Sequence, residues 1–375
     1  MIKKFWVNNY KIFREKACLD FSDVKDYDYS TNGVRDGYIN TAIIYGKNGS
    51  GKSMLGLALF DVTLHLVDKA KIPEQTMNYL PAMSEEDSLA EFNYTFAFDK
   101  QEVDYYYKKD KDARLVYEEL KLDGKSLFSC DFKTNKIEIF DREALQAGSL
   151  NFTIYNEKNP CKISVLRYIY ANTMISASSL VKKIIDFVGH MLWFRSLTEG
   201  NSFIGFHNSG AMLSQEIIAT GNLKKFEEFL RFCELDYTLE ELHLPLLGAS
   251  VVGVKYGNKK LDFLQVASSG TRLLMLFFYW SLHFNEISFL FLDEFNAYYH
   301  YSLSYKIASI VRDLKCQAVM STHDTSLLES DVLRPDCYFI MYANKIQSLP
   351  NLTKRELREV HNLEKLYRSY GFTVQ

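Results

Sequence analysis

Several features that would settle a function by themselves are scarce in this sequence. The six cysteines are scattered along 375 residues, and no two of them have the CxxC spacing of a zinc or redox site. The longest apolar run, residues 273–282, falls well short of the ~20 residues that a membrane helix needs. The net charge is only −3, from 44 basic and 47 acidic residues. These shortages argue against zinc sites, membrane spans and attraction of the whole chain to nucleic acid, and leave open a local basic patch.

The bulk composition is that of a globular protein. Hydrophobic residues make up 47% of the sequence and aromatic residues 15%, so an ample core can form. The length favours one large domain with an insertion, or two domains. The opening residues, MIKKFWVNNYKIF, are too polar for a signal peptide. We therefore expect a cytoplasmic protein with reduced, buried thiols.

One short stretch carries a specific signal for nucleotide binding. Residues 46–53 read GKNGSGKS, which fits the phosphate-loop pattern of glycine, four residues, glycine, lysine and serine. The apolar run NTAIIY precedes it and a helical pattern follows, so backbone N–H groups at a helix start would face phosphate. Lys52 would contact the β- and γ-phosphates of ATP, and Ser53 would bind Mg²⁺. A chance glycine-rich turn is the alternative, and the flanking strand and helix argue against it.

Two further apolar runs end in residues typical of ATP hydrolysis. FLFLDE ends in Asp293, which would hold Mg²⁺, and Glu294, which could act as general base towards the attacking water. The run CQAVMSTHD predicts a second buried strand, and His323 follows where that strand ends, so it could sense the γ-phosphate. Taken singly, each has a plain alternative, because strand ends often carry acids or a surface histidine. Their order after a phosphate loop favours the catalytic interpretation.

A serine-glycine pair at another helix start is less specific. Ser268 and Gly270 lie in ASSGTRLL, directly before a long apolar helix. Backbone N–H groups and a hydroxyl could meet phosphate there. A simple helix N-cap is the alternative, and in isolation it is the preferred interpretation.

The remaining chain predicts an α/β fold divided into three segments. Residues 90–140 alternate like strands and contain the hairpin signal Asp123-Gly124, whereas 141–245 read as helical. The last third alternates apolar strands with helices, which is typical of a parallel sheet. The predicted segments are 1–144, the first half of the core with a β lobe; 145–248, a helical insertion; and 249–375, the second half of the core.

The order of these motifs resembles the ATP-binding-cassette (ABC) ATPases. The opening VNNYKIFREKACLDF and the loop GKNGSGKS look like the SMC and RecF branch of that class. The closest resemblance is to bacterial AAA-family ATPases of abortive infection, AbiL-like or OLD-like. It covers roughly 1–140 and 249–375, and it is carried by the β lobe, SSGT, DEFNAYYH, STHDTSLLE and the tail SLPNLTKRELREVHNLEKLYRSYGF.

The resemblance implies a composite ATP site in a head-to-head dimer, with larger assemblies of dimers allowed. On one subunit the implied ATP-site residues are Asn48, Gly49, Gly51, Lys52, Ser53, Asp293, Glu294 and His323. Ser268 and Gly270 would reach the nucleotide held by the second subunit. The loop 295–300 would cross the dimer seam.

Departures from the family pattern sharpen the expectation. The signature reads Ala-Ser-Ser-Gly-Thr instead of Leu-Ser-Gly-Gly-Gln, which predicts slow hydrolysis, and Gln101 is a poor candidate for the glutamine loop. The insertion lacks heptads and a cysteine hook. The chain has no further ~100-residue block for a separate catalytic domain. A destructive output is therefore expected from another polypeptide.

The preferred hypothesis is a cytoplasmic ATPase that serves as sensor or scaffold of an anti-phage, abortive-infection system. ATP-dependent dimerisation would control a separate nuclease or toxin, with 145–245 as the contact surface, so its deletion should spare ATP binding. A RecF-like or SMC-like ATPase that clamps nucleic acid is the alternative. A transporter subunit, which would need a membrane partner, is the third hypothesis.

Two other segments are weaker candidates for binding. The run from Tyr105 to Lys109 could stack on a base, although a solvated strand edge is the preferred interpretation, and residues 354–365 read as an amphipathic helix.

Overall fold

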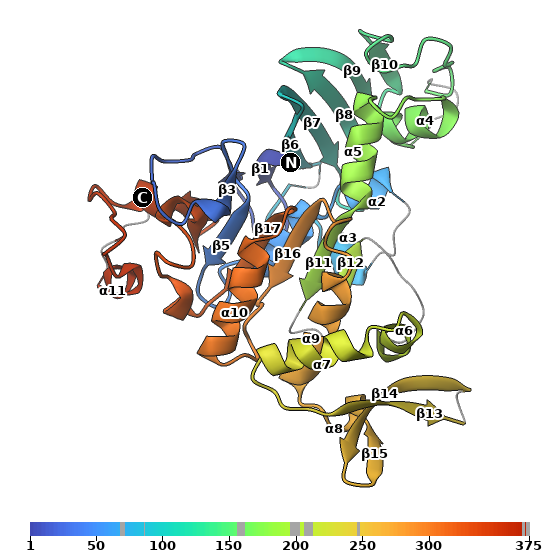
Figure 1. The fold of residues 1–375 in the computed structure, drawn as a ribbon. Helices are drawn as coiled ribbons and strands as arrows, with labels where there is room; N and C mark the ends of the chain where they lie inside the picture. The colour runs from blue at the N-terminus through green and yellow to red at the C-terminus, as the bar shows by residue number, and fades with distance from the viewer. Residues whose placement is uncertain are drawn as a thin grey trace.

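The frame of the molecule is a pair of large sheets. The structure is a computed structural model, and it describes residues 1–67, 72–85, 87–155, 162–195, 203–205, 213–245, 248–369 and 372. Within these residues, two sheets have seven strands each, a third has three strands and a fourth has two. Figure 1 shows the antiparallel β lobe at one end, the three-stranded sheet at the other, and the core sheet between them.

The core sheet is the layer that carries the phosphate loop. Its order is β12-β11-β16-β17-β5-β18-β19, parallel from β11 to β18 and antiparallel at both edges. Every residue of β5, β16 and β17 is buried, as predicted for apolar runs inside a parallel sheet. The strands are β5 Thr41–Tyr45, β11 Met191–Arg195, β12 Phe203–Gly205, β16 Phe289–Asp293, β17 Gln317–Thr322, β18 Tyr338–Tyr342 and β19 Lys345–Ser348.

The β lobe is an antiparallel sheet ordered β10-β9-β8-β7-β6-β1-β2. The predicted turn at Asp123-Gly124 joins β8 to β9, and both residues have the positive φ of a two-residue hairpin turn, 48° and 78°. Its strands are β1 Ile2–Asn8, β2 Ala17–Asp20, β6 Ala90–Phe98, β7 Gln101–Lys109, β8 Leu115–Leu122, β9 Lys125–Asp131 and β10 Lys136–Ile139. The smaller sheets are β3 Val34–Arg35 with β4 Tyr38–Ile39, and β13 Leu239–Leu244, β14 Ala249–Tyr256 and β15 Lys259–Asp262.

Helices flank these sheets. They are α1 Lys52–Leu59, α2 Thr63–Leu66, α3 Pro73–Thr76, α4 Val165–Asn172, α5 Leu180–Gly189, α6 Leu213–Ala219, α7 Leu223–Phe232, α8 Phe263–Val266, α9 Ser269–Ser281, α10 Tyr301–Arg312 and α11 Leu363–Arg368. Short 3-10 turns lie at η1 Thr31–Gly33, η2 Thr325–Leu327, η3 Pro335–Cys337 and η4 Leu349–Leu352. None of the described helices has the length and apolar character needed to cross a bilayer.

The segment predicted to be a helical insertion contributes a strand to the core. The helix predicted through MLWF ends at Gly189, and β11 follows it as a parallel neighbour of β16. A short apolar run of this length fits a buried strand as well as a helix, and pairing with β16 decides the outcome. Deleting 145–245 would therefore remove a core strand, which argues against the clean deletion expected from the sequence. The segment boundaries at 144 and 248 stay a prediction.

The tyrosine-lysine run lies in the middle of the β lobe. Its strand, β7, pairs with β6 on one side and β8 on the other, so the predicted solvated edge is wrong. Tyr105, Tyr107 and Lys109 are buried, whereas Tyr106 and Lys108 face the other side. The buried tyrosines are closed to base stacking because their rings belong to the core.

Candidate nucleotide-binding site

The phosphate loop joins β5 to α1 with a shape that depends on glycine. Gly49 and Gly51 have φ of 77° and 101°, in the left-handed region that favours glycine. A Cβ atom added at Gly51 would lie 2.2 Å from Cδ1 of Ile12 and 3.0 Å from Cε of Met341. Both atoms are the ends of flexible side chains, so the positive φ, more than the close approach, requires glycine at position 51.

The loop offers hydrogen-bond donors suited to phosphate. Within the described residues, the N–H groups of Gly51, Lys52 and Ser53 have no acceptor, as expected for the first turn of a helix. The buried Ser50 hydroxyl also has no partner there. Free donors at a helix N-terminus form an anion site, so the loop fits the phosphates of a nucleotide.

Three predicted residues meet at the mouth of the loop. Lys52 Nζ donates to the Gly46 carbonyl at 2.8 Å and lies 3.1 Å from Glu294 Oε1. The other oxygen of that carboxylate, Oε2, lies 2.8 Å from Nδ1 of His323. Lys52 and Glu294 are 4% and 8% exposed, so their attraction is weakly screened by water. The structure thus brings the predicted phosphate lysine, general base and switch histidine together.

The predicted magnesium ligands also lie together. Burial raises the pKa of Asp293, while hydrogen bonds from the hydroxyls of Ser321 and Ser53 act in the opposite direction. A hydroxyl and a carboxylate are oxygen donors of the kind that Mg²⁺ prefers. Within the described residues no group of three or more His, Cys, Asp or Glu side chains could hold a metal. Ser53 and Asp293 fit an ion whose other ligands are phosphate oxygens and water.

Among the described residues, the signature residues make no hydrogen bond or ion pair to the phosphate loop of the same chain. Ser268 is the N-cap of α9, where its side chain accepts from the N–H of Thr271 at 3.2 Å, so the plain N-cap interpretation holds within the chain. Gly270 packs against the segment after Glu294, since an added Cβ would lie 2.9 Å from the carbonyl oxygen of Tyr298. Their predicted role across a dimer stays a prediction.

A pocket beside the loop involves residues that the sequence did not point to. Its volume is about 570 Å³, and Lys47 to Ser50 line one side of it. The other side comes from Tyr342, after which β18 turns, and from Tyr367 and Arg368 of α11. The tail was predicted only as an amphipathic helix over 354–365, which is wrong for most of that range, because α11 begins at Leu363. No local signal could place α11 here, because more than 300 residues separate it from the loop.

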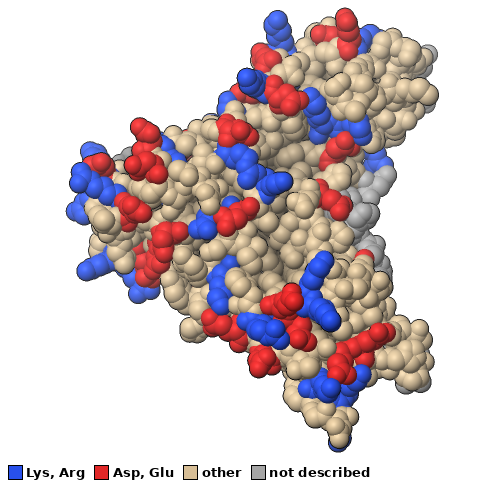
Figure 2. Space-filling view, in the orientation of Figure 1, with Lys and Arg blue, Asp and Glu red and all other residues tan. Residues whose placement is uncertain are grey.

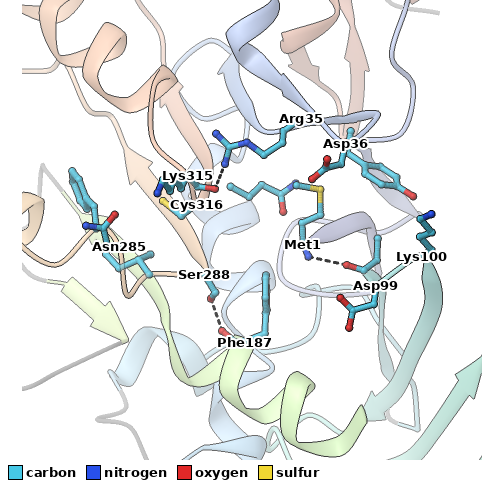
Figure 3. A pocket seen from close by; sticks show the side chains of 15 residues that line it. Met1, Arg35, Asp36, Asp99, Lys100, Phe187, Asn285, Ser288, Lys315 and Cys316 are labelled. Atoms are coloured by element: carbon cyan, nitrogen blue, oxygen red, sulfur yellow. Dashed lines mark hydrogen bonds between the residues drawn. The ribbon is translucent and has the colours of Figure 1, made fainter. Parts of the chain in front are cut away.

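A second cavity, of about 940 Å³, lies at the other end of the core strands (Figure 3). Cys316 and Ser288, which precede β17 and β16, line it together with Asp99 and Lys100 of the β lobe. The phosphate loop follows the carboxyl end of β5, which is parallel to these strands. This cavity is therefore separate from the nucleotide site.

Comparison with known proteins agrees with the resemblance over part of the chain. Residues 177–329 match the family model described as "AAA domain, putative AbiEii toxin, Type IV TA system". The match contains Asp293, Glu294 and His323, and the phosphate loop lies outside it. No curated protein matches the sequence. The predicted resemblance to abortive-infection AAA ATPases is thus confirmed, but its expected coverage is wrong: the match begins inside 145–248 and contains none of 1–140.

Solved structures of SMC heads and RecF resemble the chain at low identity. The head of SMC bound to the C-winged helix domain of ScpA is 15% identical, with 92% of this chain and 97% of that chain covered and a TM-score of 0.47. The SMC head domain from Thermotoga maritima is 13% identical, with 95% of this chain and 99% of that chain covered and a TM-score of 0.43. The recombination mediator RecF is 13% identical, with 93% of this chain and 98% of that chain covered and a TM-score of 0.42. At these scores the likenesses carry no functional weight.

Proposed function

We propose that this chain binds and hydrolyses ATP and acts as the regulatory ATPase of a bacterial defence or toxin–antitoxin pair. The observation that carries the proposal is the cluster of Lys52, Glu294 and His323 at the mouth of the phosphate loop. The family description, which names a toxin and a type IV system, supports the biological setting.

The contacts of Glu294 suggest how ATP would activate the base. Glu294 is held between Lys52 and His323, so its carboxylate is engaged on both oxygens. Phosphates bound by the loop would draw Lys52 towards them and release one oxygen of Glu294 to accept a proton from water. His323 would stay on the other oxygen and orient the base.

Magnesium would complete the phosphate charge balance. Ser53 and Asp293 would hold the ion, which on binding would neutralise charge on the phosphate oxygens. The hydroxyl of Ser321 donates to Asp293 at 2.6 Å and keeps this ligand in place before the ion arrives.

The output of the ATPase is proposed to be a change of assembly. Within the described residues no hydrogen bond or ion pair joins Ser268 or Gly270 to the loop 46–53, which suits a signature that acts on the nucleotide of a second copy. Gly270 touches Tyr298 in the segment after Glu294, so closure of a dimer would be felt at the hydrolytic centre. A separate effector, a nuclease or toxin, would be held in one state and released in the other.

Recovery of partners from the native host tests this role. Tagged Glu294→Gln protein would be purified in ATP and Mg²⁺, and Lys52→Ala protein, which cannot hold phosphate, would be the matched control. A stoichiometric nuclease or toxin-like protein with the first variant alone supports the proposal. DNA and recombination factors would favour the nucleic-acid clamp instead. Lys, Arg, Asp and Glu are interspersed over the face in Figure 2, which does not favour such a clamp.

A further inference from the structure

Two strand exits at the nucleotide site are joined residue by residue. Ser321 Oγ donates to Asp293 at 2.6 Å and accepts from the N–H of Glu294 at 3.0 Å. The next residue, Thr322, donates its hydroxyl to Oδ1 of Asn296 at 2.6 Å. These contacts hold the strand end with the predicted metal ligand and base against the strand end with the switch histidine.

Asn296 binds the chain on both sides of the switch histidine. Its Oδ1 accepts from Thr322, and its Nδ2 donates to Asp324 Oδ2 at 3.2 Å. The N–H of Asp324 in turn donates to Thr322 Oγ1 at 3.0 Å, which closes a ring of hydrogen bonds around His323. Asn296 is 6% exposed, whereas the His323 side chain is 47% exposed. The ring therefore holds the backbone on both sides of His323, whose exposed imidazole contacts Glu294.

We propose that Asn296 is a positioning residue that aims His323 at Glu294 and transmits to the switch any movement of the segment after Glu294. The inference rests on the proposed ATPase function. A buried side-chain amide can hydrogen-bond through its N–H and its oxygen to the two residues that flank a catalytic group. It then fixes that group without touching the substrate. Asn296 lies two residues before Tyr298, against which Gly270 packs. A movement of the signature would therefore reach His323 through the segment after Glu294.

Steady-state ATP hydrolysis by Asn296→Ala tests the assignment. We expect kcat to fall about tenfold with KM within about twofold of the parent, because small errors in the position of a catalytic group cost up to ~100-fold. In a His323→Ala background the same change should have less than about a twofold effect, since the residue it positions is gone. Multiplicative losses, or a kcat equal to the parent, would overturn the assignment.

A charge swap separates positioning from simple destabilisation. Asn296→Asp alone sets two carboxylates against each other and should also lower kcat, whereas Asn296→Asp with Asp324→Asn restores an amide–carboxylate pair and should recover most of the rate. Failure of the swap to recover any rate in a folded protein would contradict the positioning role. Asn40→Ala is the matched control: Asn40 is 0% exposed and donates to the carbonyls of Leu314 and Cys316, away from the site, so kcat should be unchanged.

A spectroscopic readout keeps the inference distinct from the proposed function. The ¹³Cε1 resonance of His323, assigned with His323→Gln, should shift in Asn296→Ala and stay in place in Asn40→Ala, even without ATP. If the parent fails to hydrolyse ATP while this shift is seen, the ATPase proposal fails and the positioning contact stands. An unmoved resonance would refute the contact itself.

Discussion

A buried charge cluster behind the phosphate-loop helix gives the most quantitative stability prediction. Asp61 lies two residues beyond α1, and its carboxylate accepts from the hydroxyls of Tyr79 at 2.6 Å and Tyr107 at 2.9 Å. It also pairs with Lys109 Nζ at 2.5 Å, with side-chain exposures of 1% for the lysine and 0% for the aspartate. Replacing Asp61 by leucine would remove this 2.5 Å partner from a buried ammonium. Removal of one partner from such a pair costs about 3–5 kcal/mol of the free energy of unfolding.

Denaturant unfolding followed by circular dichroism measures this cost. We expect Asp61→Leu and Lys109→Met each to lower the unfolding midpoint in guanidinium chloride. The double variant should recover part of the loss, because neither member of the pair is then left buried without the other. A loss below about 1 kcal/mol in Asp61→Leu would refute the reasoning from the burial of this pair.

Three further predictions concern the nucleotide site. Burial raises the folded-state pKa of Asp293, so its ionisation destabilises the protein without nucleotide as the pH rises above about 4. Asp293→Asn should therefore raise the thermal midpoint at pH 7, lose that advantage below pH ~4, and abolish hydrolysis. A lower midpoint at pH 7 would contradict this. Gly270→Ala should cost about 1–3 kcal/mol and slow hydrolysis, because its Cβ meets the Tyr298 carbonyl, whereas Gly148→Ala, with open space around it, should do neither. Gly51→Ala should weaken binding of a fluorescent ATP analogue at least tenfold, since the loop cannot keep its shape, and unchanged affinity would count against the geometry described.

The parts of the site predictable from sequence are those with local signals. The loop 46–53 can be recognised from its spacing, and Asp293 and Glu294 from the apolar strand before them. His323 is assigned through its order after those motifs, and the structure places it against Glu294. In each case a few consecutive residues carry both the element and the chemistry.

The parts that the sequence did not reveal depend on pairing between distant segments. β11 is a strand because β16 is available beside it, although its five residues alone fit a helix. Alternation along β7 predicted a strand, but only the neighbours on both sides show that Tyr105 and Tyr107 are core residues. Asn296 carries no motif of its own, and its role follows from two contacts across 26 and 28 positions of the chain.

Nucleotide trapping by Glu294→Gln tests the central claim most directly. Purified variant protein would be incubated with ATP and Mg²⁺, its mass determined by size exclusion with light scattering, and its bound nucleotide identified after denaturation. The account predicts a dimer that retains uncleaved ATP, and a monomer without nucleotide for Lys52→Ala under the same conditions. Hydrolysis by Glu294→Gln at the parent rate would show that Glu294 is not the base and would contradict the account.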